Sequence, residues 1–145
     1  MAFSKELSVG NRILDSEHKK LFNIINEITH LIIAKDINTL IDAFELLENG
    51  LRAYFVAEEN IARTIGFDFT QHRMAHQDLL NEFRLIKNEL TARYGIWSRH
   101  NEKGYIASLR DCLIQHIQED ARPLRIILDT HLYDLKPGCM EVAHS

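Results

Sequence analysis

Apolar positions recur at three- and four-residue spacing along most of this chain, which is the pattern of amphipathic helices. No alternating apolar and polar run predicts a strand. A first helix is expected from a cap at Asp15 or Ser16 to about Ala34. The apolar positions along this first helix are Leu21, Phe22, Ile25, Ile28, Ile32 and Ile33. The pattern therefore predicts an all-α fold.

Capping residues and glycines divide the rest of the helical pattern into three further segments. Asp36 is placed to cap the second helix and Asp68 or Thr70 the third, while Gly66 and Gly95 follow their last turns. The expected helices cover residues 37–65, 71–94 and 104–130, and a polar loop over residues 95–103 precedes the last of them.

The helices carry inner stripes and short connections that favour antiparallel neighbours. We predict an up-down-up-down four-helix bundle over residues 1–130, with an extended arm before the first helix and a short tail over residues 131–145. Pro123 is expected to kink or break the fourth helix. The inner stripes consist of Leu40, Ala43, Phe44, Leu47, Leu51, Tyr54, Phe55, Glu58 and Ile61 on the second helix, and of Leu109, Cys112, Leu113, His116, Ile117 and Asp120 on the fourth.

Composition excludes several classes of partner. The 145 residues fit one domain, and 46% hydrophobic residues supply a core without disulfides. A net charge of −4 without a basic stripe argues against nucleic acid. No apolar run is long enough for a membrane span, and residues 1–10 lack a signal core, so a cytoplasmic location is expected. Cys112 and Cys139 are then free thiols.

Candidate metal ligands occur as pairs four residues apart, a spacing that places both side chains on one helix face. One pair falls on each of the last three helices, and a histidine lies near the start of the first. We therefore expect their side chains to converge inside the bundle. The candidate ligands are His18, Tyr54, Glu58, His72, His76, His116 and Asp120.

Such a convergence favours a metal, because a buried carboxylate without a positive charge is costly. Imidazole and carboxylate ligands suit iron, manganese or zinc, and helical bundles with such pairs commonly hold two metals. Any one pair arises often by chance, whereas candidates on all four helices do not. The remaining histidines are interpreted as ordinary surface, loop or tail residues: His30, His100, His131 and His144.

The order of these motifs resembles bacterial hemerythrin domains and the wider His-His-Glu superfamily. The resemblance covers about residues 3–120. It is carried by Phe3, Val9-Gly10, Asp15-Ser16-Glu17-His18, Leu21-Phe22, Ile25-Asn26, Tyr54-Phe55-Val56-Ala57-Glu58-Glu59, His72-Arg73-Met74-Ala75-His76 and His116-Ile117.

The resemblance implies two non-haem iron ions with an oxo or hydroxo bridge. It implies that His72, His76 and His116 hold one iron, that His18 holds the other, and that Glu58 bridges both. In the family, dioxygen binds end-on at the second iron.

Two departures from the family pattern bear on these roles. Tyr54 replaces a histidine, and we expect its phenolate to ligate or closely approach the second iron, favouring the ferric state. The acid after His116 lies four residues on, at Asp120, whereas bacterial hemerythrins usually have it five residues on, where this chain has Ala121. Asp120 is kept as the expected ligand because distant relatives use that spacing. Cys112 stands where the family often has tryptophan.

Three functions stay open. The first is a protein that binds O2 or NO for sensing, storage or delivery. The second is a di-iron oxidase or peroxidase acting on peroxide or O2. The third is a degenerate bundle with an altered or partly empty site. The residues favour a metal- and oxygen-binding protein over a true enzyme, and they leave a signalling or redox partner and the oligomeric state open.

Overall fold

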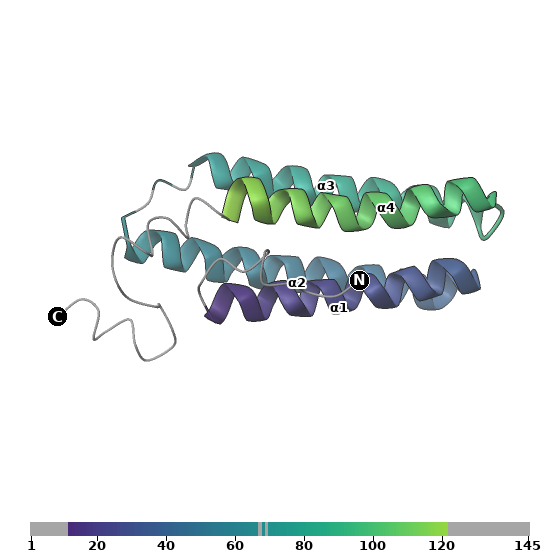
Figure 1. The fold of residues 1–145 in the computed structure, drawn as a ribbon, viewed down its shortest axis with the longest axis horizontal. Helices are drawn as coiled ribbons and strands as arrows, with labels where there is room; N and C mark the ends of the chain where they lie inside the picture. The colour runs from purple at the N-terminus through teal and green to yellow at the C-terminus, as the bar shows by residue number, and fades with distance from the viewer. Residues whose placement is uncertain (1–11, 67, 69, 122–145) are drawn as a thin grey trace.

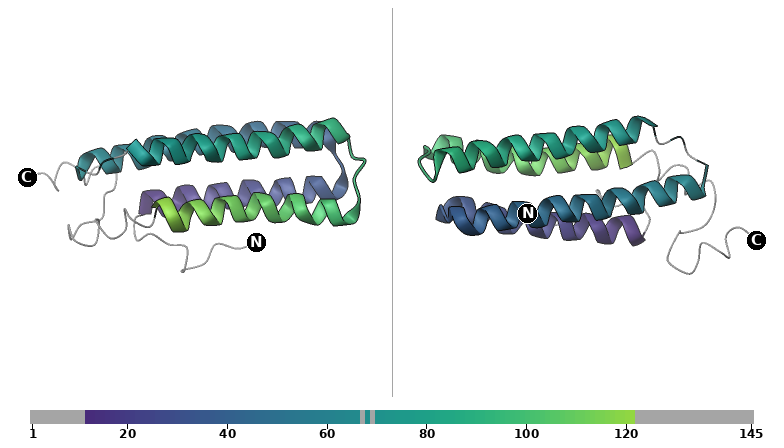
Figure 2. Two further views of the ribbon diagram at one scale, coloured as in Figure 1. Left: turned by 90° about the horizontal axis from the view of Figure 1, so that it is seen from above. Right: turned by 180° about the vertical axis from the view of Figure 1, so that it is seen from behind.

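Four antiparallel α-helices form the described part of the protein. The computed structural model describes residues 12–66, 68 and 70–121. Within them it contains α1 (Arg12–Ala34), α2 (Ile37–Thr64), α3 (Thr70–Arg93), α4 (Arg99–His116) and a short π-helical segment, η2 (Ile117–Ala121), but no strand. Each helix packs against its two neighbours in a closed ring (Figures 1 and 2). The predicted all-α up-down-up-down bundle is confirmed.

Some expectations fall on residues outside this part of the chain. The extended arm, the C-terminal tail, Pro123 and Cys139 lie outside the described residues. None of the described helices combines the length and the apolar character that a membrane-spanning helix needs.

The core consists of the helix stripes that the sequence predicts, with one correction. The predicted positions on α1 and α2 are buried, apart from a partly buried Phe55 and an Ile33 that is 55% exposed. Leu31 takes the place expected for Ile33, because it completes the stripe one turn after Ile28. Gly50 brings α1 and α2 close together, since a Cβ there would lie 3.3 Å from Leu21 Cδ2.

The ends of α2 and α3 follow the local signals in the sequence. The side chain of Asp36 accepts a hydrogen bond from the Thr39 amide, as expected for the cap of α2. Asp68 accepts from both the amide and the hydroxyl of Thr70 at the start of α3. Tyr94 and Gly95 after α3 both have positive φ, and Gly95 adopts its φ of +86° without the strain of a Cβ.

Two predicted helix starts are wrong. α4 begins at Arg99 and not at Gly104, because Ser98 caps it by accepting a hydrogen bond from the Asn101 amide. Gly104 therefore lies inside the helix. The expected cap at Asp15 or Ser16 is also wrong, since the chain is already helical from Arg12.

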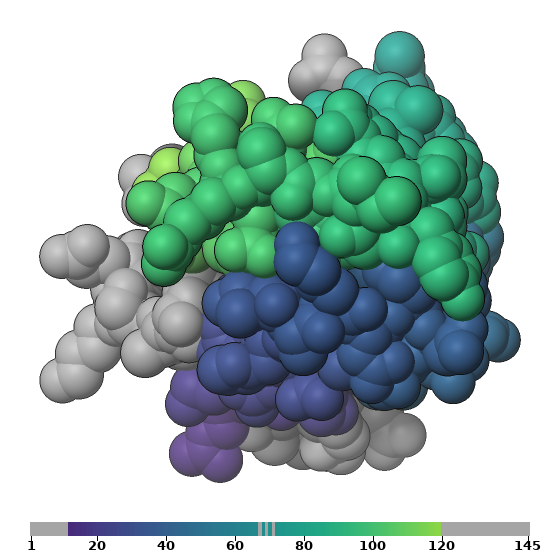
Figure 3. All heavy atoms as spheres, turned by 90° about the vertical axis from the view of Figure 1, so that its right-hand side faces the viewer, coloured from purple at the N-terminus to yellow at the C-terminus, as the bar shows by residue number. Residues whose placement is uncertain are grey.

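The two ends of the bundle differ in how the chain closes them. The α1–α2 and α3–α4 connections, residues 35–36 and 94–98, lie at one end, which faces the viewer in Figure 3. There the Lys35 ammonium lies 4.9 Å from the centre of the buried Trp97 ring and joins the two helical hairpins. Within the described residues, the opposite end holds the α2–α3 connection.

Candidate metal centre

The predicted ligands come from all four helices and lie towards the end that holds the α2–α3 connection. α1 contributes His18, and α2 contributes Tyr54 and Glu58. The remaining described candidates are His72 and His76 on α3 and His116 on α4. All six residues are buried, with exposed fractions between 0% and 7%. The backbone of Asp120 lies in η2, but its side chain is outside the described part of the structure.

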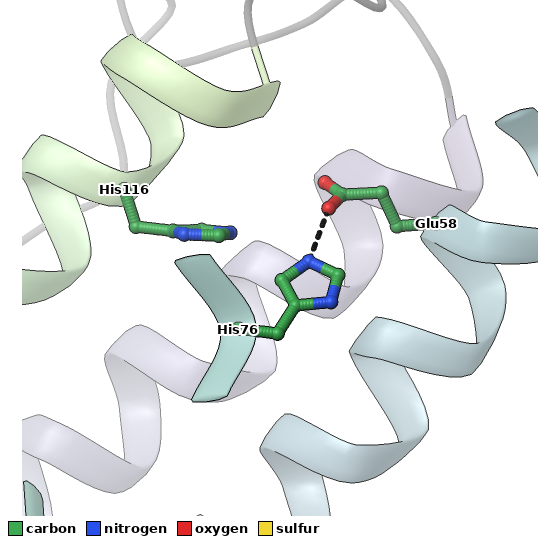
Figure 4. A group of neighbouring side chains, drawn as sticks. All are labelled: Glu58, His76 and His116. Carbon is green, nitrogen blue, oxygen red and sulfur yellow. Dashed lines mark hydrogen bonds and ion pairs between the residues drawn. The ribbon is translucent and has the colours of Figure 1, made fainter. Parts of the chain in front are cut away.

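Three of these side chains form a compact cluster. One ligand atom each from Glu58, His76 and His116 lies within 4.8 Å of the others. Figure 4 shows the Glu58 carboxylate and the two imidazole rings converging from α2, α3 and α4. Nε2 of His76 lies 2.6 Å from Glu58 Oε1 and donates a hydrogen bond to this carboxylate. These three residues therefore make a donor set of the size and kind that holds a metal.

The Tyr54 hydroxyl lies inside the same cluster. It donates a hydrogen bond to Glu58 Oε2 at 2.6 Å, and its oxygen lies 3.1 Å from Nε2 of His116. The phenol thus contacts residues from two helices at once. Its side chain is 0% exposed, so its oxygen is held within the group of candidate ligands.

His18 and His72 flank the cluster. The His18 ring meets the Tyr54 ring edge-on, with centroids 4.9 Å apart. The His72 ring meets the His76 ring edge-on at 6.4 Å. Neither belongs to the group of donors within 4.8 Å, but both are packed directly against a member of that cluster or against Tyr54.

Burial and charge set the protonation of two of these groups. Burial lowers the pKa of His18 to about 4, against partly opposing effects of Glu58 and Asp15, so its imidazole is neutral at neutral pH. Burial alone would raise the pKa of Glu58. The hydrogen bonds from His76 and Tyr54 lower the pKa of Glu58, as does the electrostatic effect of the nearby His116. Together these effects outweigh burial. An ionised carboxylate and a neutral imidazole are the forms that bind metals.

Comparison with known proteins identifies the family of the chain. The Hemerythrin HHE cation binding domain matches residues 9–123, most of the chain. The chain belongs to the hemerythrin family. It is similar to Bacteriohemerythrin of Pseudomonas aeruginosa (strain LESB58), with 19% identity over 134 residues that cover 82% of this chain and 88% of that protein. Bacteriohemerythrin of Pseudomonas paraeruginosa (strain DSM 24068 / PA7) gives the same identity and coverage. No solved structure matches the chain.

One contact in this hemerythrin domain was not expected from the sequence. The Phe55 ring stacks on the His76 ring, with centroids 3.8 Å apart and planes 12° apart. Phe55 lies beside Tyr54 in sequence, so helical periodicity alone directs it to the edge of the stripe. The stacked ring fixes the plane of the imidazole whose Nε2 faces Glu58.

The half-buried thiol of Cys112 makes a second contact that was not expected from the sequence. Its Sγ donates a hydrogen bond to Glu82 Oε2 at 2.7 Å. Burial first, and then the hydrogen bond and charge of Glu82, raise the pKa of Cys112 to about 12. Only a very small fraction of this thiol is ionised at neutral pH.

We therefore expect Cys112 to react slowly with a disulfide reagent. In a Cys139→Ser background, the rate at neutral pH should be about a hundredfold below that of free cysteine, because the thiolate is the reactive form. Glu82→Gln should raise the rate several-fold by removing one cause of the high pKa. Glu89→Gln is the matched control, since Glu89 bonds to Tyr105 instead. Equal rates for the two variants would contradict this account of the pKa.

Proposed function

We propose that this hemerythrin domain binds two non-haem iron ions with an oxo or hydroxo bridge and uses them to bind O2 or NO for sensing, storage or delivery. The observation that carries the proposal is the meeting of Glu58, His76 and His116 in the bundle interior, with donor atoms within 4.8 Å. Family membership supports it, because the matching domain is described as cation binding.

In the proposed site, His72, His76 and His116 would hold one ion and His18 and Tyr54 would hold the other. Glu58 and Asp120 would serve as ligands to both. The donors fit iron, because imidazole and carboxylate ligands suit this metal and Glu58 and His18 are in the protonation states that bind it. When bound, iron supplies a reversible one-electron redox change and a coordination position for a diatomic ligand.

The surrounding residues prepare this site. Glu58 is held in place by Tyr54 and His76, both of which donate hydrogen bonds to its carboxylate. Those protons must leave the donor atoms when a metal takes their place, so we expect metal uptake to release protons. Phe55 orients His76 by stacking. Buried Leu51 and Ile61, each about one turn from the cluster on α2, keep water away from its flanks.

A second candidate function, a di-iron oxidase or peroxidase, is favoured by Tyr54. If the phenol that replaces the family's histidine does not ligate, two positions on one iron would be open, and this would favour redox turnover over a stable adduct. A partly empty site is the third candidate. Peroxide with a reducing dye separates the first two: sustained turnover supports the enzyme, and a stable spectral adduct supports the binding protein.

Elemental analysis tests the metal centre itself. Protein loaded anaerobically with Fe²⁺ and then desalted should contain about two iron ions per chain, as in other helical bundles with paired ligands. The chelator-treated protein provides the baseline, and its circular dichroism shows whether the bundle stays folded. Less than one iron per folded chain contradicts the proposed function.

A further inference from the structure

The candidate ligands are deeply buried, so a metal ion needs a route to them. None of the six described candidate residues is more than 7% exposed. A cavity of about 270 Å³ lies between α3 and the α4–η2 segment, and His116 lines it. His116 also contacts Tyr54 at the centre of the site. The cavity therefore adjoins the metal centre at one of its own donors.

The lining of this cavity is polar and acidic. Asp78 and Glu82 on α3 and Glu119 on η2 contribute three exposed carboxylates, and no lysine or arginine is among the described residues that line it. Gln115 donates to Glu119 across one turn. A cleft lined by one sign of charge concentrates ions of the opposite sign. The cavity thus attracts cations and repels anions.

A second cavity beside α3 differs from the first in the character of its lining. The cavity between α2 and α3, about 170 Å³, has an apolar floor that includes Phe44 and Phe83. Arg84, Lys87 and Glu48 also line it, and Glu48 pairs with Arg84, so its charged side chains sum to a net positive charge. This charge disfavours the approach of a metal ion. The two cavities beside α3 therefore differ in the sign of the charge on the ions that they attract.

We propose that the α3–α4 cavity is the route by which a hydrated divalent cation reaches the metal centre. Asp78, Glu82 and Glu119 draw the cation in, and His116 is the first candidate ligand that it meets. This inference rests on the proposed function, because the route leads to the metal site. It concerns the rate of uptake, whereas the proposed function concerns the amount of metal bound at equilibrium.

Stopped-flow uptake of Co²⁺ by the chelator-treated full-length protein tests the route. Asp78→Asn/Glu82→Gln/Glu119→Gln should slow uptake about tenfold at low ionic strength, and high salt should remove most of the difference. The matched control is Glu27→Gln/Asp42→Asn/Glu45→Gln, which changes the net charge equally at exposed carboxylates on α1 and α2. The control should retain the wild-type rate, and both variants should reach the wild-type Co²⁺ content.

A steric variant provides an independent readout. Ala75→Leu adds bulk to the cavity lining and should slow uptake at every ionic strength. Ala57→Leu is its control, because Ala57 precedes Glu58 as Ala75 precedes His76 and is partly exposed as well. The route is overturned if the triple cavity variant and its triple control slow uptake equally. It is also overturned if the triple cavity variant and Ala75→Leu both keep the wild-type rate. Either result leaves the proposed metal site intact. Failure of the wild-type protein to bind Co²⁺ or iron overturns the proposed function as well.

Discussion

Glu58→Gln should lower the iron content from about two ions per chain to less than one while the bundle stays folded. Glu58 is 0% exposed and lies between Tyr54 and His76, at 2.6 Å from a donor on each side. The amide has the shape of the carboxylate but lacks its negative charge, so it is a poor bridge between two cations. Elemental analysis after iron loading, together with circular dichroism, measures both parts of this expectation.

The neighbouring Glu59 offers a matched control. Its partly exposed carboxylate pairs with Arg73 at 2.6 Å and with Arg63 at 3.7 Å, away from the candidate ligands. Surface ion pairs of this kind contribute about 0–1 kcal/mol, so Glu59→Gln should change neither the iron content nor the fold appreciably. Two irons per chain in Glu58→Gln would show that Glu58 is not a required ligand.

Tyr54→Phe should abolish a visible charge-transfer band of the ferric protein. The band is expected because the Tyr54 oxygen lies among the candidate donors, within 2.6 Å of Glu58 and 3.1 Å of His116, where a metal in the cluster would be within its reach. A phenolate adds negative charge beside the metals and favours Fe³⁺, so the wild type should also be slow to reduce. Tyr54→His should restore the family's donor set and reversible O2 binding.

Tyr105→Phe controls for the loss of a phenol elsewhere. Tyr105 is also buried, and its hydroxyl donates to Glu89, away from the candidate ligands. Its replacement should leave the visible spectrum unchanged. If the ferric wild type has no such band and Tyr54→Phe has the wild-type spectrum, Tyr54 does not ligate iron and its hydroxyl serves only to hold Glu58.

The fold could be predicted because burial on helices follows a strict period. The inner stripe of α2 was predicted almost completely, since nearly every third or fourth position from Leu40 to Ile61 is apolar. The start of α4 was missed because the polar residues after Ser98 have no apolar period, and the Ser98 side chain defines that start by a single hydrogen bond. Local capping geometry of this kind is not visible in a hydrophobicity pattern.

The site could be predicted as a set of residues but not as a geometry. Four-residue spacing placed Glu58, His72, His76 and His116 on buried faces. Spacing could not show that Tyr54 hydrogen-bonds to Glu58, because that contact depends on rotamers. The role of Asp120 stays a prediction. The count of four residues from His116 assumes an α-helix, whereas η2 has the wider π-helical turn, whose hydrogen bonds span five residues.

The position of the candidate centre has an entropic consequence. Within the described residues, two connections close one end of the bundle, whereas the start of α1 and the end of α4 lie at the other end and are not joined to each other there. His18 and His116 lie near those two helix ends and are separated by almost the whole described chain. Fixing two distant points of a chain to one another removes more freedom from the unfolded ensemble the longer the intervening segment is. A bridged pair of metal ions, one held by His18 and the other by His116, would therefore act as a reversible cross-link between α1 and α4, the two helices that the described residues do not connect directly.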